Sequence, residues 1–396
     1  MSGRASAWAA HATGFFILSL VPSSALMMAL WGVALGASPV VIGLLVGIRS
    51  LLPIFLSIHG GALVDRLGVR PVLIVCAAVG VVSAPLYPLF MSVWVGMVLQ
   101  LAAGLAQAVG WIGIQAHVAG LADRPEREAG RFSFASALGT GVGPIVFGTV
   151  WQWFGATPTF LFFALWNACL LAVVLLLPTG DGGTRGRPEG NRFAHLLPRL
   201  SDYVAAAGLL ATPAVFFVVA MTFLRLAVFG IQASFYTVFL EAANYPSRTI
   251  GLLIGLSSLI GGPAALLAEK MSRWLAPPLL LLLLTATALL AISATPLLSG
   301  LPSLLIAACV FGLGTGSTLP LLLRVLSSGV EAGRKGLSFG LRGTANRLSS
   351  LVVPVAMGAA ADGFGLSASF YVTGGVLLAA MAVVLPMAAR LSRHEA

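Results

Sequence analysis

Long apolar runs separated by short polar segments dominate the pattern of this chain. Most runs cover roughly 20 residues or more, the length that a helix needs to cross a bilayer, and they lack the alternation expected of barrel strands. The pattern predicts twelve transmembrane helices, at about 8–34, 39–64, 70–90, 93–121, 131–153, 157–177, 208–241, 249–268, 277–296, 301–325, 335–360 and 367–389. A polar stretch rich in Gly and Arg separates the sixth helix from the seventh and predicts a flexible linker. We therefore expect an N-terminal six-helix bundle (1–177), a linker (178–207) and a C-terminal six-helix bundle (208–396).

The two halves of the chain repeat one another. The segment Ile42–Gly47 (IGLLVG) recurs 208 residues later as Ile250–Gly255 (IGLLIG). Further matches follow in the same order, with offsets of 205 to 210 residues: Gly104 with Gly312, Ser133 with Ser338, Pro144 with Pro354, and Gly148 with Gly358. Parallel repeats of this size in a membrane protein indicate two similar helical bundles with a substrate site between them.

Composition and charge agree with a chain surrounded by lipid. Hydrophobic residues make up 59% of the chain and charged residues only 9%, against about 25% charged residues in a soluble protein. Sixteen Lys and Arg residues fall in alternate loops, the linker and the termini, whereas the opposite loops hold only Arg248. Because cytoplasmic loops carry the excess of basic residues, both termini and the linker are predicted to be cytoplasmic. The net charge of +10 thus reflects topology, and no basic patch interleaved with aromatic residues predicts a nucleic-acid partner.

The segment between the second and third predicted helices reads GGALVDRLGVRP (60–71). It resembles the signature loop of the major facilitator superfamily, and the matching positions are Gly61, Leu63, Asp65, Arg66, Gly68 and Arg70. Twelve spans, a central linker and two similar halves extend this resemblance over nearly the whole chain. The resemblance implies an all-α membrane protein of two pseudo-symmetric six-helix bundles that works by alternating access.

The resemblance also implies a gate and a direction of transport. In the family the loop aspartate meets the start of the eleventh helix and an arginine before the fifth, so we expect Asp65 to contact the segment near Lys335 and Arg131. The fifth predicted helix carries most of a pattern seen in exporters, many of them proton antiporters, at Gly139, Gly143, Pro144 and Gly148. Ordinary close packing of small residues explains the same pattern. Many members have an arginine where this chain has Gln100, so a coupling mechanism that depends on it is not transferred.

Two predicted helices carry polar stripes at helical spacing. The stripe on the fourth helix starts at Gln100 and continues through Gln107, Trp111 and Gln115; the stripe on the seventh comprises Arg225, Phe229, Gln232 and Tyr236. Polar side chains are costly in lipid, so each stripe should face a wet cavity or a partner helix. The resemblance implies that both helices line the substrate cavity. We predict substrate contacts from all members of these stripes except Gln100, and from Arg49, Arg342 and Asn346; polar packing between helices is the alternative.

The charges inside the predicted spans are one-sided. Arg49, Arg225, Arg342 and Arg347 lie well inside spans, whereas no Asp or Glu lies near a span centre. Each central charge costs about 2.5–3.5 kcal/mol, and the planar guanidinium suits carboxylate or phosphate. These residues predict a cavity for an anionic or zwitterionic solute with Arg225 as its main anchor. A structural or gating role for the arginines is the alternative. Candidates for proton coupling are His11, Asp65 and Glu241.

The predicted function is secondary active transport. We expect export of a small organic anion, zwitterion or amphipathic metabolite by proton or solute antiport, from a bacterial inner membrane, by a protein that the family resemblance implies is a monomer. The sequence shows no nucleophile–base constellation, metal-ligand spacing or phosphate-binding loop, so it predicts neither an enzyme nor a bound cofactor. The alternatives are proton-coupled uptake of an organic anion, multidrug efflux, lipid flipping, and a transport-inactive receptor or scaffold.

Overall fold

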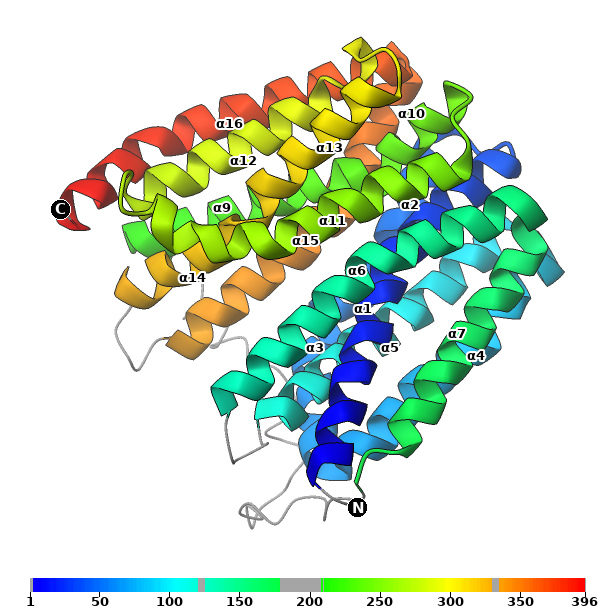
Figure 1. The fold of residues 1–396 in the computed structure, drawn as a ribbon. Helices are drawn as coiled ribbons and strands as arrows, with labels where there is room; N and C mark the ends of the chain where they lie inside the picture. The colour runs from blue at the N-terminus through cyan, green and yellow to red at the C-terminus, as the bar shows by residue number, and fades with distance from the viewer. Residues whose placement is uncertain (1–2, 120–124, 179–207, 209, 330–334, 396) are drawn as a thin grey trace. The chain divides into compact units, whose positions relative to one another are not determined.

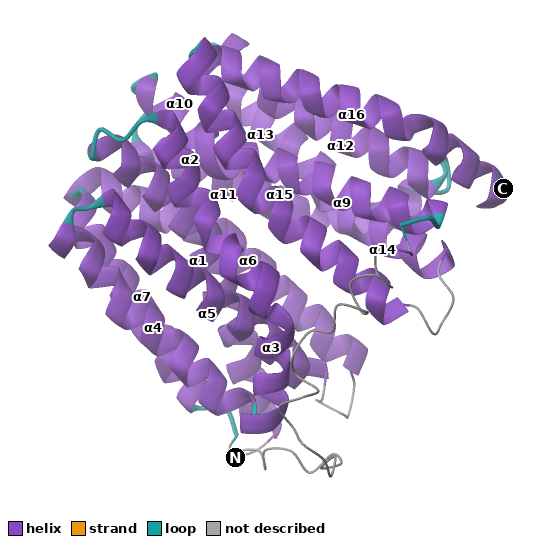
Figure 2. Cartoon of the chain, turned by 180° about the vertical axis from the view of Figure 1, so that it is seen from behind, coloured by secondary structure: helices purple, strands orange, loops and turns teal. Residues whose placement is uncertain are grey.

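The computed structural model describes residues 3–119, 125–178, 208, 210–329 and 335–395, and within them it contains helices and no strand (Figures 1 and 2). The helices of the first sequence half are α1 (Gly3–Ala34), α2 (Pro39–Gly47), η1 (Ile48–Ser50), α3 (Leu51–Leu67), α4 (Val69–Phe90), α5 (Val93–Ala119), α6 (Pro125–Phe154) and α7 (Ala156–Leu175). Those of the second half are α9 (Pro213–Ile231), η2 (Gln232–Tyr236), α10 (Thr237–Ala242), α11 (Ser247–Met271), α12 (Pro277–Ser293), η3 (Thr295–Leu297), α13 (Leu301–Gly316), α14 (Thr318–Gly329), α15 (Lys335–Phe364) and α16 (Leu366–Glu395). Apart from Pro178, the predicted linker lies outside the described residues.

The described helices account for the twelve predicted spans. Ten helical segments are long and apolar enough to cross a membrane. The other two spans are α12, which is shorter, and α15, whose first half carries Arg342, Asn346 and Arg347. The all-helical prediction is therefore confirmed. The predicted start of the seventh span at residue 208 is wrong, because α9 begins at Pro213, and proline favours the first turn of a helix, where its missing N–H is not needed.

Two spans depart from regular α-helix where the sequence places polar residues. The second span passes through a short 3-10 turn at Ile48–Ser50, which contains Arg49. The seventh span passes through a π-helical turn at Gln232–Tyr236. Single π turns inside α-helices occur often at functional sites. Both irregular turns contain a residue predicted to contact substrate, Arg49 in the first and Gln232 in the second.

The sequence repeat is also a repeat of close helix contacts. In α2, a Cβ built on Gly43 would clash with the carbonyl oxygen of Pro354 in α15. In α11, a Cβ built on Gly251 would clash with the carbonyl oxygen of Pro144 in α6. Only glycine permits this approach of two backbones, so the repeated hexapeptide specifies the same type of packing twice.

A second pair of glycines shows the same correspondence. Gly104 in α5 lies directly against the carbonyl oxygen of Arg49, and Gly312 in α13 lies directly against that of Ser257 in α11. Both the glycines and the residues that they face are 208 positions apart in the chain. The two halves therefore share a contact pattern at the level of single backbone atoms.

Contacts divide the chain into two compact units. The first comprises 1–37, 48–197 and 245–255, and the second comprises 38–47, 198–244 and 256–396. Each unit thus includes a short segment from the other sequence half. These two segments carry the repeated hexapeptide, Ile42–Gly47 and Ile250–Gly255.

The first unit has a buried apolar core. Ile17 of α1, Leu73 of α4, Ile114 of α5, and Leu170 and Val174 of α7 belong to one cluster of buried side chains. Four helices therefore meet around a common apolar centre.

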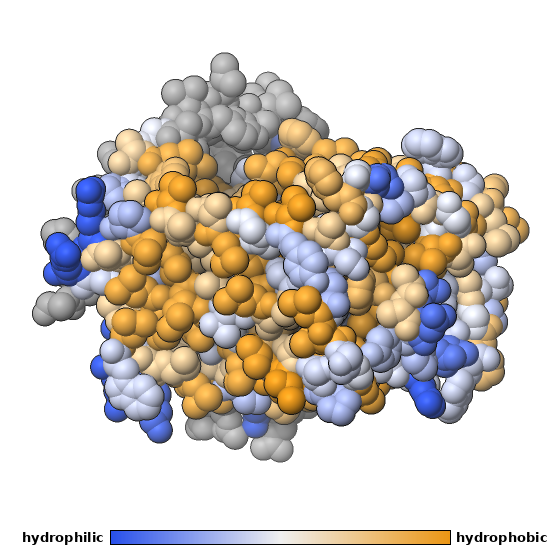
Figure 3. Space-filling model, turned by 90° about the horizontal axis from the view of Figure 1, so that it is seen from above, coloured by the Kyte–Doolittle hydropathy of each residue, from blue (hydrophilic) through white to orange (hydrophobic). Residues whose placement is uncertain are grey.

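The outer surface of the helices is apolar. Large side chains such as Trp94, Leu266 and Val383 are 72%, 83% and 79% exposed. Figure 3 shows apolar residues over most of the face in view, with strongly polar residues gathered towards its edges. In water such a surface would be unfavourable, and its natural surroundings are lipid.

Candidate functional site

Arg225, the predicted main anchor for the substrate, belongs to the second unit. It lies half-buried in the middle of α9, where its Nε donates a hydrogen bond of 2.6 Å to Thr318 Oγ1 at the start of α14. Its guanidinium carbon lies 5.1 Å from the ring centroid of Phe229, one turn further along α9. Within the described residues, Nη1 and Nη2 of Arg225 make no hydrogen bond and no carboxylate forms an ion pair with it. A neutral hydroxyl and an aromatic face therefore orient this guanidinium and leave its terminal nitrogens for another acceptor.

The eleventh span brings a second cation to the same region. Arg342 of α15 is half-buried, and its charge acts on Arg225. The two helices are joined near this point because Ser349 Oγ donates a hydrogen bond of 2.8 Å to the carbonyl oxygen of Phe223 in α9. Asn346, also half-buried, lies one turn after Arg342. The structure thus places Arg225 and Arg342, two residues predicted to bind substrate, within electrostatic range of one another; Asn346, a third, follows Arg342 by one turn of α15.

Gln232 and Tyr236 lie in the π-helical turn of the seventh span and are buried, with 6% and 3% of their surfaces exposed. The Gln232 amide donates a hydrogen bond of 2.9 Å to Ser257 Oγ in α11. This contact links two helices of the second unit. Gln232, predicted to contact substrate, thus contributes to packing between helices, and Tyr236 is buried in the same turn.

In the first unit, Arg49 joins three spans. Its Nη1 donates a hydrogen bond of 3.2 Å to the carbonyl oxygen of Val21 in α1, and its Nη2 donates to Gln107 Oε1 in α5. Gln107 in turn donates from Nε2 to the carbonyl oxygen of Ile17, at 3.3 Å. Arg49 and Gln107, both predicted to contact substrate, thus form a polar junction between helices of the first unit.

Two further members of the α5 stripe, Trp111 and Gln115, have different surroundings. Trp111 stacks on Phe132 of α6, with ring centroids 5.6 Å apart and an angle of 21° between the ring planes. Gln115 is exposed. Residues that share one helix face in the sequence are thus divided between a hydrogen-bonded junction, an aromatic stack and an open surface.

The signature loop joins α3 to α4. Gly68 lies between the two helices with φ of 85°, a left-handed conformation that favours glycine. Arg70 donates from Nη2 to the carbonyl oxygen of Leu175 at the end of α7, at 2.7 Å, where a cation complements the helix dipole. Arg66 is exposed. Gly61 and Asp65 lie in α3, but the Asp65 side chain is outside the described residues, so its predicted gating contact stays a prediction.

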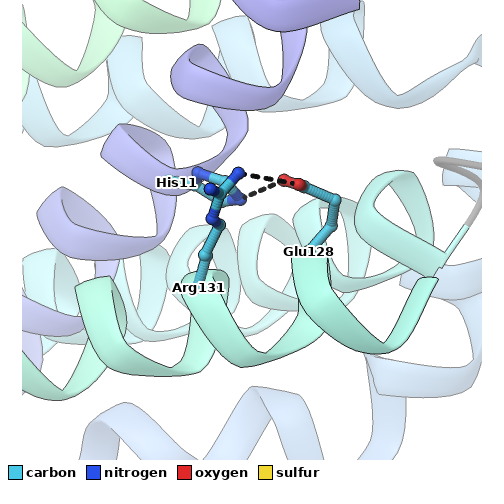
Figure 4. A network of polar contacts seen from close by, with 3 residues as sticks. All are labelled: His11, Glu128 and Arg131. Atoms are coloured by element: carbon cyan, nitrogen blue, oxygen red, sulfur yellow. Dashed lines mark hydrogen bonds and ion pairs between the residues drawn. The ribbon is translucent and has the colours of Figure 1, made fainter. Parts of the chain in front are cut away.

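A small ionic network lies where α1 meets α6 (Figure 4). Glu128 Oε2 lies 3.0 Å from His11 Nε2, and Glu128 Oε1 lies 3.0 Å from Arg131 Nη1. His11 and Glu128 are each 17% exposed. Of the predicted coupling residues, His11 thus has an acidic partner. Glu241 is half-buried and lies in α10, at the C-terminal end of the seventh span. The partner that the structure shows for Arg131 is Glu128.

A family model described as the Major Facilitator Superfamily matches residues 9–295. The chain belongs to the major facilitator superfamily. It is therefore an integral membrane transporter and not an enzyme.

Solved structures of other facilitators share its fold. The chain is similar to a mutant form of the nucleoside transporter NupG, with a TM-score of 0.81, 13% identity, and coverage of 96% of this chain and 99% of that one. It is similar to a bacterial homologue of the human lysosomal transporter Spinster, with a TM-score of 0.77, 14% identity, and coverage of 100% and 99%. A POT family transporter in complex with 5-aminolevulinic acid gives a TM-score of 0.73 at 12% identity, with coverage of 98% and 96%. At these identities the likeness concerns the fold alone.

The exporter-like pattern of this facilitator lies at helix contacts. A Cβ on Gly139 would clash with the carbonyl oxygen of Phe15, and a Cβ on Gly143 would clash with that of Ser19, both in α1. Pro144 presents its own carbonyl oxygen to Gly251 of α11. These residues allow α6 to approach two other helices closely.

Three polar partners were not predicted from the sequence: Thr318, Ser257 and Glu128. Thr318 and Ser257 are small hydroxyl residues in apolar helices, and nothing in their local pattern distinguishes them from packing residues. Glu128 carried a usable signal, because it precedes Arg131 by three residues in a helix, the spacing of an ion pair.

Proposed function

We propose that this facilitator is a secondary active transporter that exports a small organic anion, zwitterion or amphipathic metabolite by proton or solute antiport, with Arg225 as the anchor for the substrate's negative charge. The observation that supports this most directly is the setting of Arg225. Its Nε is held by Thr318 Oγ1 at 2.6 Å, and its guanidinium stacks on Phe229. A planar fork held in this way presents its terminal nitrogens to a carboxylate or phosphate.

Electrostatics favours an anion at this position. Arg342 acts on Arg225 as a like charge, and the described residues place no carboxylate in an ion pair with Arg225. A charge inside a span costs free energy unless it is compensated. A bound anion would reduce this cost, whereas a bound cation would add to the repulsion.

Direction and coupling rest on separate features. The Gly139, Gly143, Pro144 and Gly148 pattern resembles that of exporters and supports efflux. His11, paired with Glu128 at 3.0 Å, is the coupling residue that we propose for proton antiport, because an imidazole can accept and release a proton and an acidic partner lies beside it. Exchange of one anion for another requires no such group and is the solute-antiport form of the same proposal.

Thermal stabilisation of the purified full-length protein tests the anion anchor. A ligand that binds the folded state raises Tm by mass action. The panel contains monocarboxylates, dicarboxylates, phosphate esters, amino acids, organic cations and neutral drugs. The variants are Arg225→Ala and Arg225→Lys, and exposed Arg248→Ala is the matched control.

We expect anions or zwitterions to raise the Tm of wild-type protein and of Arg248→Ala. The shift should vanish in Arg225→Ala and fall in Arg225→Lys, because an ammonium group has no bidentate fork. Stabilisation by cations or neutral drugs that is equal in all variants would contradict the proposal and favour multidrug efflux. The sign of substrate accumulation in proteoliposomes under an imposed proton gradient separates export from uptake.

A further inference from the structure

The first unit contains a cavity of its own. It lies among α1, α4, α5 and α7, and its volume, counted as space for the centres of water molecules, is about 60 Å³. Side chains of all four helices line it, among them Met27, Tyr87, Gln100, Phe163 and Asn167. The cavity thus occupies the interior of a bundle of helices from the first half of the chain.

Gln100 is the residue that requires an explanation. Only 1% of its surface is exposed, and neither its Oε1 nor its Nε2 has a hydrogen-bond partner among the described residues. A buried amide without partners is costly, and the great majority of buried side-chain polar atoms have a partner in the protein or in ordered solvent. Because Gln100 lines the cavity, the group that satisfies its amide has room there.

Other hydrogen-bonding groups line the same cavity. Asn167 of α7 is 4% exposed and donates from Nδ2 to the carbonyl oxygen of Phe163 at 2.8 Å. Its Oδ1 lies against Gly80 of α4, so close that a Cβ there would clash with it. Ser83 and Tyr87, also from α4, are lining residues with hydroxyl groups. Amide and hydroxyl groups from three helices therefore surround a space with otherwise largely apolar walls.

The lining residues define the chemistry of a guest. None of them is acidic among the described residues, so the cavity does not suit a cation. Its one charged lining residue is Arg49, whose guanidinium already donates to Gln107 and to the carbonyl oxygen of Val21. A neutral guest with both donors and acceptors matches the Gln100 amide. A cavity of about 60 Å³ is well above the smallest volume that holds one water, about 10–15 Å³, so it has room for a small guest.

We propose that this cavity is a binding site for a small neutral hydrogen-bonding guest, held by the Gln100 amide inside the first unit. Waters and a neutral amide or alcohol of similar size share this chemistry. The guest forms hydrogen bonds with the buried Gln100 amide, so its loss should lower the stability of the protein.

The first test uses the full-length wild-type protein. A high-resolution crystal structure should show ordered density within hydrogen-bond distance of Gln100. Pressurisation of the crystals with xenon should leave the cavity without xenon, because xenon enters dry apolar cavities. Xenon density beside Gln100, or a cavity without ordered density, would overturn the proposal. Neither measurement depends on a variant that folds.

The second test compares Gln100→Leu with Leu73→Met, an apolar exchange in the same wall. If a guest satisfies the amide, Gln100→Leu removes its main partner and should lower Tm by about 2–4 °C, while Leu73→Met should change Tm little. If the amide has no partner, Leu removes an unpaired polar group and raises Tm, which would overturn the proposal.

Titration with acetamide identifies the guest. A rise in Tm of the wild type and Leu73→Met that is absent in Gln100→Leu assigns the site to a small neutral solute. Equal responses of all three proteins, together with ordered density at Gln100, assign it to water. Both results support a neutral guest.

Discussion

The two copies of the repeated hexapeptide make the same kind of backbone contact, but the residues that follow them differ in their side-chain hydrogen bonds. Two residues after each copy, Arg49 in the first half corresponds to Ser257 in the second, 208 positions later. The carbonyl oxygen of each lies against a glycine of another helix, Gly104 or Gly312. The side chains differ, because Arg49 donates to Gln107 and Ser257 accepts from Gln232. The halves therefore share a scaffold of close glycine contacts and differ in the polar groups attached to it.

The same comparison isolates Arg225. The position 208 residues earlier is Ile17, which is 4% exposed and belongs to the apolar core of the first unit. Packing that both halves share would not require a charged side chain at Arg225 and an aliphatic side chain at Ile17. This asymmetry is what the proposed role of Arg225 in binding anions explains.

The largest expected effect comes from breaking the shared scaffold. Gly104→Ala and Gly312→Ala should each destabilise the protein by about 3 kcal/mol, because a Cβ at either site meets a backbone oxygen that cannot turn away. Thermal unfolding of the purified variants measures this. In the control, Gly110→Ala in α5, the new Cβ would lie 3.6 Å from its nearest neighbours, so the variant should be tolerated. Wild-type stability of either clashing variant would show that the two halves do not depend on these contacts alike.

A smaller effect is expected where the halves differ. Arg49→Ala leaves the acceptors at Gln107 and Val21 without this donor and should cost about 1–3 kcal/mol. Ser257→Ala removes one neutral acceptor from Gln232 and should cost about 1 kcal/mol. Both values come from the Tm of purified protein. A larger loss of stability in Ser257→Ala than in Arg49→Ala would contradict the greater energetic importance that we assign to the Arg49 contacts.

The Thr318→Val variant tests whether Thr318 orients Arg225 for anion binding. The variant removes the hydroxyl that accepts from Arg225 Nε. It should weaken binding of the anions that stabilise wild-type protein by about two- to tenfold in Kd, because one hydrogen bond that orients the guanidinium is lost. Thr285→Val in α12, whose hydroxyl bonds only within its own helix, is the control. An unchanged affinity in Thr318→Val would mean that Thr318 does not orient the anchor.

The smallest expected effect concerns the network at His11. A double-mutant cycle with His11→Gln and Glu128→Gln should give a coupling free energy of about 0.2–1 kcal/mol, as for a pair that keeps access to solvent. The coupling should decrease at high salt. If proton antiport uses this pair, either substitution should also reduce proton-driven transport in vesicles. Full proton-driven transport by both variants would remove His11 from the coupling mechanism.

Much of the fold was predictable because its signals are local. Apolar runs of membrane-spanning length predict helices in lipid, and the loop GGALVDRLGVRP identifies the family. The helical spacing also put Gln107 and Gln115 on one face of α5, but only Gln107 takes part in the polar junction with Arg49. Helical spacing predicts which side chains share a face of α5, but the groups that this face meets change along the length of the helix.

The sequence by itself determined the helices, the repeat, the family and the presence of arginines inside spans. Only the tertiary structure decided the partners of the polar side chains: Thr318 for Arg225, Gln107 for Arg49, Glu128 for His11, and a cavity for Gln100. The physical reason is distance along the chain. Whether a residue forms a helix in lipid depends on its near neighbours, whereas a hydrogen-bond partner 58 or 93 residues away depends on how whole helices pack.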